Sequence, residues 1–189
     1  MDPGQIERLV DFESLLRERA LPMGLIAEGD RDRLLDRHVI DSLRAAAVVA
    51  PADRLALDLG SGAGLPGIPM ALAQPTIHVA LAEPRRRRAA FLELALDSLG
   101  LPNVSVLATR AEGLVGGSAR WDLCLARALA PMPRAWSLAR PLLRSGGRLA
   151  YFAGPLDVVP PPPLGAVSVE VSSKILVDSP GPLVILTRQ

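Results

Sequence analysis

Glycine recurs at every second position directly after a short apolar run in the sequence. The run Leu55–Leu59 contains Asp58 near its end, and Gly60, Gly62 and Gly64 follow it. Glycine lacks a Cβ atom, so it adopts left-handed backbone conformations and lets another molecule approach the main chain closely. In open sheets of parallel strands, ligands bind at the carboxyl ends of the strands. The pattern therefore predicts a buried strand that ends in a ligand-binding loop.

After this loop, short apolar runs alternate with longer helical patterns. Such alternation is typical of parallel strands that are covered by helices on both faces, and it predicts an α/β fold with a mostly parallel, doubly wound sheet. Two β-rich runs, Val167–Val171 and Leu183–Leu186, predict a C-terminal antiparallel hairpin. The other predicted strands are Leu55–Leu59, Ile77–Ala82, Val104–Leu107, Trp121–Ala126 and Gly147–Phe152, and the predicted helices are Pro66–Ala73, Arg85–Leu99 and Met132–Leu143.

The first 50 residues have helical rather than strand periodicity. Apolar residues recur at spacings of three to four over residues 5–20 and 30–50, and Asp30 is a candidate N-cap for the second helix. We therefore predict a small N-terminal helical cap in residues 1–50 and a sheet domain in residues 51–189, together forming one compact unit. Between the fifth strand and the hairpin, Pro160–Pro163 predicts an extended surface loop.

Composition limits the classes of protein and of site that this chain can represent. Of its 189 residues, 49% are hydrophobic and 22% are charged, as in a folded globular protein. The single cysteine, Cys124, excludes an internal disulfide and a multi-cysteine metal site, and we expect it to be a buried thiol in a strand. We expect no metal. The first four residues, 1–4, have neither a basic region nor an apolar run after them, and nowhere do eighteen apolar residues stand together, so we expect a cytoplasmic location.

The net charge of +1 conceals a marked asymmetry along the chain. Residues 1–83 contain 8 arginines and 13 acidic residues, a net charge of −5. Residues 84–189 contain 13 basic and 7 acidic residues, a net charge of +6. Because arginine accounts for 20 of the 21 basic residues, this composition fits planar recognition of phosphates and bases, and it fits a general compositional bias equally well.

Two classes of cofactor fit the glycine loop. Residues 62–67 match the G-x-G-x-x-G pattern of dinucleotide sites, so a nicotinamide-dependent oxidoreductase remains an alternative. The position of Asp58, and the prolines Pro66 and Pro69 in the turn that follows, favour S-adenosylmethionine, whose methionine ammonium group an acid would bind. Glu83 ends the second predicted strand, where a carboxylate accepts the ribose hydroxyls of either ligand.

Further motifs follow in a fixed order over residues 30–155. They are Arg37-His38-Val-Ile-Asp41-Ser42-Leu43, the segment 58–69, Glu83 with Arg87-Arg88-Ala-Ala-Phe91-Leu92, Arg110-Ala111-Glu112, and Arg127-Ala128-Leu-Ala130. With this series the sequence resembles the bacterial glucose-inhibited division protein B family, which methylates guanine N7 in small-subunit ribosomal RNA. The resemblance implies a class I S-adenosylmethionine-dependent methyltransferase (Rossmann-like) fold. It also implies that guanine 527 of 16S ribosomal RNA is the target, either in free RNA or in the small ribosomal subunit.

Individual residues receive roles from the resemblance and from the loop chemistry. Attack by guanine N7 needs no general base, because this nitrogen carries a free lone pair, so no catalytic acid or base is assigned. An arginine would hold guanine O6 or a phosphate rather than N7. The expected cofactor-binding residues are Asp58, Gly60, Gly62, Gly64, Leu65, Glu83, Ala111, Glu112 and Arg127, and the expected substrate-positioning residues are Arg37, Arg110 and Arg127.

Aromatic residues and departures from the family pattern complete the expectations. Tyr151 and Phe152, at a strand end, are candidate platforms for an unstacked base, whereas Trp121 and Trp136 are expected in the core. His38, on a helix beside Arg37 and Asp41, is expected to act as a cap or to pair with another side chain. Phe152-Ala153-Gly154 stands where the family usually has Leu-Lys-Gly, and Gly24-Leu25-Ile26 where it has Asn-Leu-Thr. A diverged paralogue that binds cofactor or RNA without catalysis therefore remains an alternative. The oligomeric state stays open.

Overall fold

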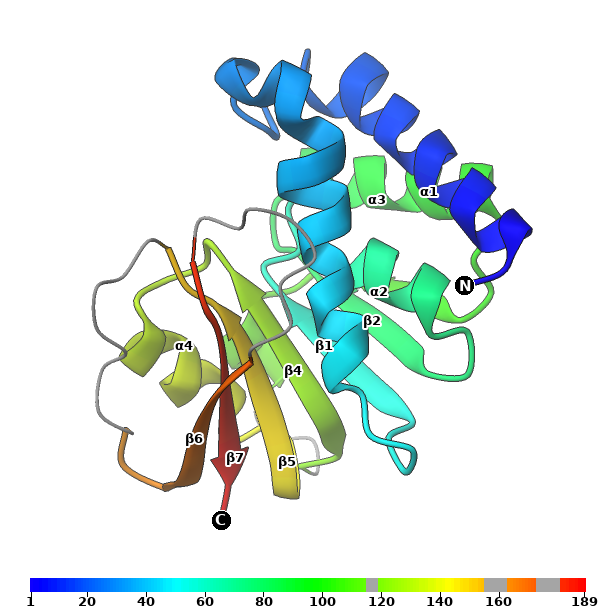
Figure 1. Ribbon diagram of the computed structural model, residues 1–189. Coiled ribbons are helices and arrows are strands. Elements are labelled where there is room, and N and C mark those ends of the chain that lie inside the picture. The colour runs from blue at the N-terminus through cyan, green and yellow to red at the C-terminus, as the bar shows by residue number, and fades with distance from the viewer. Residues whose placement is uncertain (115–118, 155–162, 173–180) are drawn as a thin grey trace.

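A seven-stranded sheet forms the centre of the molecule, with strand order β3-β2-β1-β4-β5-β7-β6 (Figure 1). The computed structural model describes residues 1–114, 119–154, 163–172 and 181–189. Strands β1 to β5 are parallel, and β7 is antiparallel to both β5 and β6. The predicted sheet with its C-terminal antiparallel hairpin is thereby confirmed. The strands are β1 (Leu55–Leu59), β2 (His78–Ala82), β3 (Val104–Leu107), β4 (Trp121–Arg127), β5 (Leu143–Phe152), β6 (Ala166–Ser172) and β7 (Leu183–Arg188).

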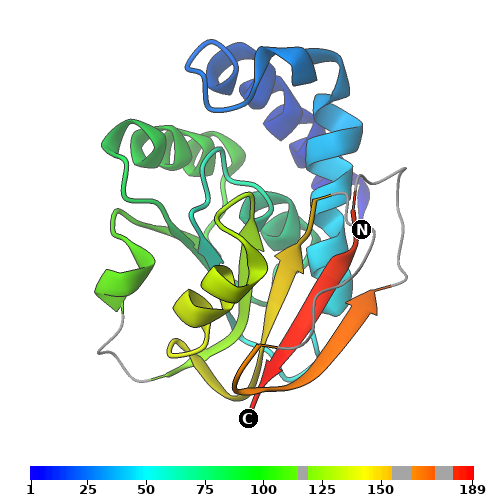
Figure 2. The same ribbon diagram turned by 90° about the vertical axis from the view of Figure 1, so that its left-hand side faces the viewer.

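Helices cover both faces of the sheet, as the predicted doubly wound arrangement requires. The helices that follow β1, β2 and β4 are α2 (Gly67–Ala73), α3 (Arg86–Leu99) and α4 (Met132–Ala139). Figure 2 shows α4 on one side of the sheet and the N-terminal helices on the other. Successive side chains of β1 pack into two different apolar clusters, with Ala56 facing α2 and α3 and Leu57 facing α4. Burial of both faces explains why the strands lack a polar alternation.

Two helical stretches form the N-terminal region. The first comprises α1 (Pro3–Leu15) and a π-helical turn over Leu16–Ala20, and a capping box between Asp2 and Gln5 fixes its start. The second comprises consecutive helical turns over Glu28–Arg33, Leu34–Ile40 and Leu43–Val48. This stretch begins before residue 30, after Ala27, so the prediction that Asp30 is its N-cap is wrong.

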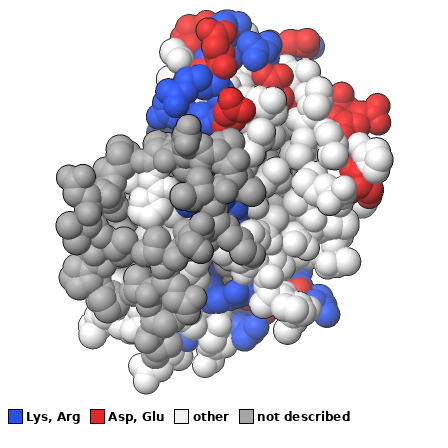
Figure 3. Space-filling view, in the orientation of Figure 1, with Lys and Arg blue, Asp and Glu red and all other residues white. Residues whose placement is uncertain are grey.

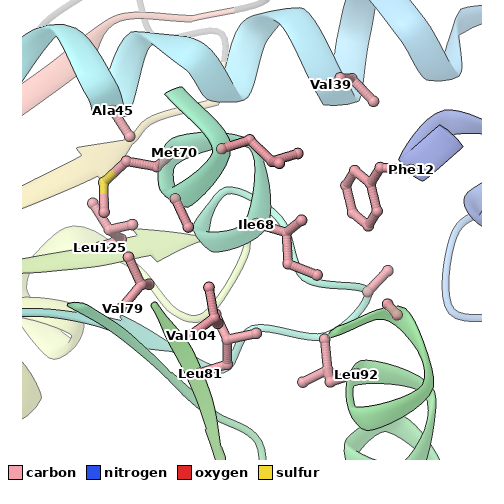
Figure 4. Packing of buried hydrophobic residues seen from close by; sticks show 14 of the residues in the cluster. Phe12, Val39, Ala45, Ile68, Met70, Val79, Leu81, Leu92, Val104 and Leu125 are labelled. Carbon is pink, nitrogen blue, oxygen red and sulfur yellow. The ribbon is translucent and has the colours of Figure 1, made fainter. Parts of the chain in front are cut away.

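One apolar cluster joins the N-terminal helices to the sheet (Figure 4). Phe12 and Val39 come from the two N-terminal stretches, and they pack with Ile68 of α2, Leu92 of α3 and Leu81 of β2. Phe12 is fully buried, and truncation of such a ring costs about 3–5 kcal/mol. The cluster therefore contains residues from both sides of position 50, and the division into 1–50 and 51–189 stays a prediction.

Several predicted boundaries differ from the structure. The helix predicted over Met132–Leu143 ends at Ala139, because Pro141 has no N–H group with which to continue the helical hydrogen bonds. Strand β5 starts at Leu143 rather than Gly147, and its pairing with β4 shifts register between Trp121 and Leu123. Of the predicted proline loop, residues 160–162 lie outside the described residues. No described helix has the length and apolar character needed to cross a membrane.

Candidate functional site

The glycine loop lies at the carboxyl end of β1, and its glycines have the predicted left-handed conformation. Gly60, Gly62 and Gly64 have φ angles of +70°, +58° and +86°. A Cβ atom at Gly60 would lie 2.7 Å from Cδ1 of Leu129, and one at Gly64 would lie 2.5 Å from Cδ1 of Ile68. At Gly62 the nearest atom would be 3.8 Å away, so this is the glycine beside open space. Close ligand approach is thus available at Gly62, while packing explains the other two glycines.

A cavity of about 240 Å³ lies against this loop. The loop contributes Gly60, Gly62 and Leu65 to its wall, and the ends of other elements contribute Arg127 from β4 and Arg88 from α3. The N-terminal helices close the remaining side with Ile26, Asp30 and His38. The structure therefore brings four of the predicted site residues, from the loop and β4, to one cavity that the helical cap covers.

Asp58 lies behind the loop and does not line the cavity. Its side chain is buried, and Oδ2 accepts a hydrogen bond from the backbone N–H of Gly67 at 3.0 Å. Oδ1 has no hydrogen-bond partner among the described residues. Burial raises the pKa of Asp58 to about 7, because the charged carboxylate loses its hydration. One oxygen of Asp58 thus orders the start of α2, and the other is available to a donor.

Glu83 supports the loop from the end of β2. Oε2 accepts from the N–H of Gly62 at 3.1 Å, and Oε1 accepts from the N–H of Arg85 at 2.9 Å. The guanidinium of Arg88 lies 3.9 Å from Oε2. The side chain is almost fully buried and does not line the cavity. In this structure Glu83 therefore acts on the loop backbone, and its predicted contact with ribose hydroxyls stays a prediction.

Arg127 connects the end of β4 to the second N-terminal helical stretch. Nη2 donates to the carbonyl of Arg37 at 2.6 Å, and Nη1 donates to Ser42 Oγ at 3.0 Å and to the carbonyl of His38 at 3.2 Å. The carboxylate of Asp41 lies 3.5 Å from Nη2. The motif predicted over residues 37–43 therefore surrounds the guanidinium of Arg127 and fixes the cap over the cavity.

Asp30 is the cavity residue whose role the sequence did not reveal. Oδ1 accepts from Arg37 Nη1 at 2.9 Å, and Oδ2 lies 3.1 Å from His38 Nε2. His38 is therefore paired, as predicted. Burial lowers its pKa, and the positive charge of the nearby Arg127 lowers it further. The only local signal was an acid seven or eight residues before a basic pair. Side chains that contact each other on a helix are three or four residues apart, so this spacing did not indicate a contact.

A sequence-family comparison identifies the relatives of the chain. The model described as rRNA small subunit methyltransferase G (GidB) matches residues 5–156. The chain belongs to this family. A relative from Frankia alni, named ribosomal RNA small subunit methyltransferase G, is 42% identical over 146 residues, which cover 76% of this chain and 55% of that protein. The chain thus spans about half the length of the curated relatives it matches.

Solved structures place this GidB family chain among the class I methyltransferase folds. An S-adenosylmethionine-dependent methyltransferase, SibL, matches with a TM-score of 0.59 and 18% identity, covering 76% of this chain and 53% of that one. TYW2 of M. jannaschii, solved in complex with AdoMet, matches with a TM-score of 0.56 and 15% identity, covering 86% and 75%. At such identities the likeness shows the fold alone, and it confirms the predicted class I S-adenosylmethionine-dependent methyltransferase (Rossmann-like) fold.

Three further predicted site residues of this GidB family member lie away from the cavity. Arg110 is exposed, and Ala111 packs against the apolar cluster beneath α4. Glu112 is half exposed and pairs with Arg134 at 2.9 Å. None of the three lines the cavity. Their predicted roles in binding cofactor or substrate stay predictions.

The aromatic residues divide differently from the expectation. Phe152 is buried at 7% exposure as part of the apolar cluster, and the guanidinium carbons of Arg44 and Arg127 lie 5.8 and 5.7 Å from its ring centroid. The prediction that Phe152 offers a platform to a base is therefore wrong. Tyr151 is half-buried and donates to the carbonyl of Ala130 at 3.1 Å.

The core aromatics and the thiol agree with the prediction. Trp121, Trp136 and Cys124 are buried, and burial raises the pKa of the Cys124 thiol far above its ordinary value. The described part of the chain contains no group of three His, Cys, Asp or Glu residues that could hold a metal ion.

Proposed function

We propose that this chain is a cytoplasmic S-adenosylmethionine-dependent methyltransferase that modifies guanine N7, at position 527 of 16S ribosomal RNA. Membership of the rRNA small subunit methyltransferase G family is the observation that carries the proposal. The cavity between the glycine loop and the cap gives the activity a site at the end of the sheet where such ligands bind. We assign residues 51–189 to the methyltransferase domain and residues 1–50 to a cap that closes it.

The residues around the loop fit S-adenosylmethionine. Gly62 leaves room for a ligand beside the main chain, and Asp58 Oδ1 lacks a partner among the described residues. A carboxylate oxygen of this kind suits the ammonium group of the methionine portion, which would hold Asp58 in its charged form. Glu83 already orders the loop and retains acceptor capacity for ribose hydroxyls. When bound, the cofactor supplies a methyl group on a sulfonium centre.

The protein's own contribution is orientation rather than proton transfer. Guanine N7 attacks with an existing lone pair, so the protein must align the acceptor with the methyl group, and such alignment is worth roughly 7–11 kcal/mol in favourable cases. Arg127 is held by its contacts with the cap and therefore positions the wall of the cavity. Arg37 and Arg110, which are more exposed, are the side chains that we assign to holding RNA.

Methyl transfer to defined small subunits tests this proposal. We would incubate the chain with tritiated S-adenosylmethionine and small ribosomal subunits from cells that lack the mark, and then cleave the RNA with borohydride and aniline. The proposal predicts label in 16S RNA and cleavage at 527. Subunits with adenine at 527 serve as the control and should remain unlabelled. Label at another nucleotide, or an equal signal with adenine, would contradict the assigned position.

A calorimetric titration with S-adenosylmethionine separates the proposal from its rivals. A diverged paralogue would bind the cofactor and transfer no methyl group to either free RNA or subunits. A nicotinamide-dependent enzyme would bind the dinucleotide instead, and the family match gives no support to that alternative. Cofactor binding together with site-specific transfer would leave the methyltransferase as the one consistent interpretation.

A further inference from the structure

Five arginines gather at the end of the sheet opposite the glycine loop, where the parallel strands begin. Two of them precede the first residues of β1 and β4, two lie in β5, and one ends the antiparallel β7. Figure 3 shows blue side chains along this lower edge of the molecule. We term these residues the strand-start patch: Arg54, Arg120, Arg144, Arg148 and Arg188.

Two carboxylates belong to the same region, and both are buried beneath the guanidinium groups. Asp53 is 3% exposed and binds Arg148, and Asp122 is 8% exposed and accepts from Arg144 Nε at 2.5 Å. Asp122 also accepts from the N–H of Arg54 at 2.8 Å. Five positive side chains and two negative ones leave a net charge of +3, and the negative charge is below the surface. Solvent at this end therefore meets guanidinium groups.

Contacts with the protein hold these guanidinium groups in place. Arg54 Nη1 donates to the carbonyls of Pro51 and Asp53 at 2.8 and 2.7 Å. The guanidinium carbon of Arg120 lies 4.8 Å from the ring centroid of Trp121. Because these side chains are already ordered in the free protein, they lose less conformational entropy when a partner binds. The patch is thus arranged in advance for planar, charged acceptors.

The surroundings of the patch favour phosphates over an apolar partner. The exposed neighbours include Pro51, Ala52, Ser145 and Gly146. One large exposed apolar residue, Leu164, lies two residues before Ala166, which pairs with Arg188. A protein interface would need a cluster of apolar or aromatic anchors, and a single leucine does not provide one. Arginine binds phosphate oxygens through two parallel N–H bonds. An array of arginines in largely polar surroundings matches the backbone of RNA.

We propose that the strand-start patch is a second RNA-binding surface, which contacts phosphates of an RNA helix at a distance from the catalytic cavity. The choice of ribosomal RNA as the partner rests on the proposed function. The patch faces away from the glycine loop, so the target loop and a neighbouring helix of a folded RNA would contact opposite ends of the same sheet. The contact would supply affinity and orientation, and it would carry no sequence information.

Salt dependence of RNA binding tests this inference. The probe is a fluorescein-labelled RNA hairpin of about 20 base pairs, and anisotropy gives its Kd between about 50 and 250 mM KCl. Log K falls as log salt rises, and each lost phosphate contact reduces the magnitude of this slope by about 0.7–1. We expect the double variant Arg54→Gln/Arg120→Gln, which loses two contacts, to reduce the magnitude of the slope by about 1.4–2. The double variant Arg54→Lys/Arg120→Lys, which retains both charges, should restore most of it.

The matched control removes two arginines from the first N-terminal helical stretch. Arg8→Gln/Arg19→Gln changes the net charge equally and should leave the slope unchanged. Equal slopes for the patch variant and the control would overturn the inference. Failure of the wild-type chain to bind the RNA hairpin would also overturn it. Binding to phosphatidylserine vesicles without an RNA effect would identify a membrane surface instead. Methyl transfer is assayed separately, so a failed patch and a failed methyltransferase proposal give different results.

Discussion

Replacement of Asp58 by asparagine should stabilise the folded protein and impair cofactor binding. Burial raises the pKa of this carboxyl from 3.8 to about 7. Between these values the unfolded chain ionises Asp58 while the folded chain keeps it protonated, so stability falls as the pH rises from about 4 to 7. Asparagine carries no charge, and its side-chain oxygen can still accept from the N–H of Gly67. The variant therefore avoids the cost of burying a carboxylate.

The size of the effect follows from the two pKa values. A difference of one pKa unit corresponds to about 1.36 kcal/mol, so the wild-type cost approaches about 4 kcal/mol above pH 8 and is about 1.5–2 kcal/mol at pH 5. The difference in unfolding free energy between Asp58→Asn and wild type should thus increase by about 2.5 kcal/mol from pH 5 to pH 8. Steric changes caused by the substitution contribute equally at both pH values and cancel.

Urea unfolding at the two pH values measures this difference. Asp122→Asn is the matched control, because hydrogen bonds from Arg54 and Leu55 and the ion pair with Arg144 outweigh burial and lower the pKa of Asp122. That carboxyl is ionised throughout this range, so its substitution should cost the same stability at pH 5 and at pH 8. A pH-independent difference for Asp58→Asn, or one that shrinks as the pH rises, would refute the reasoning.

Three further predictions concern the loop, the cap and the thiol. Gly62 has a φ angle of +58° and open space around it, so Gly62→Ala should lose about 1–2 kcal/mol of stability through backbone strain. The same variant should weaken S-adenosylmethionine binding in calorimetry. Gly60→Ala should lose more stability, because its Cβ atom would also meet Leu129. Arg127→Met should lower the unfolding midpoint by removing three hydrogen bonds to the cap, and an unchanged midpoint would contradict this role. Cys124, with its raised pKa, should resist iodoacetamide in the native protein and react in urea; rapid native alkylation would disprove its burial.

Local patterns were sufficient to predict the strands and the shape of the loop. Strand β1 is apolar at every position except Asp58 because both faces of the sheet are covered, and this property is visible in Leu55–Leu59 itself. The glycines of the loop adopt positive φ angles, which restrict the residue type directly. Features set by one residue and its chain neighbours are therefore readable from the sequence.

The roles of Asp30 and Phe152 depend on how the helical cap packs and not on a local sequence pattern. Asp30 met the local criteria for an N-cap, but the packing of the cap turns it towards Arg37 and His38 at the cavity. Phe152 lies at a strand end, where an exposed ring was expected, and arginines 44 and 127 cover it. No local pattern encodes which arginine reaches which ring, since the fold decides it.

The position of β7 between β5 and β6 has a consequence for synthesis. On the described part of the sheet, β6 pairs with β7 alone, although β6 comes first along the chain. A growing polypeptide therefore makes β6 before its neighbour exists, and the edge of β5 also stays unpaired until Leu183–Arg188 has left the exit tunnel. Ribosome-bound chains that stop before residue 183 should thus expose the edge of β5 and an unpaired β6, which makes them substrates for chaperones.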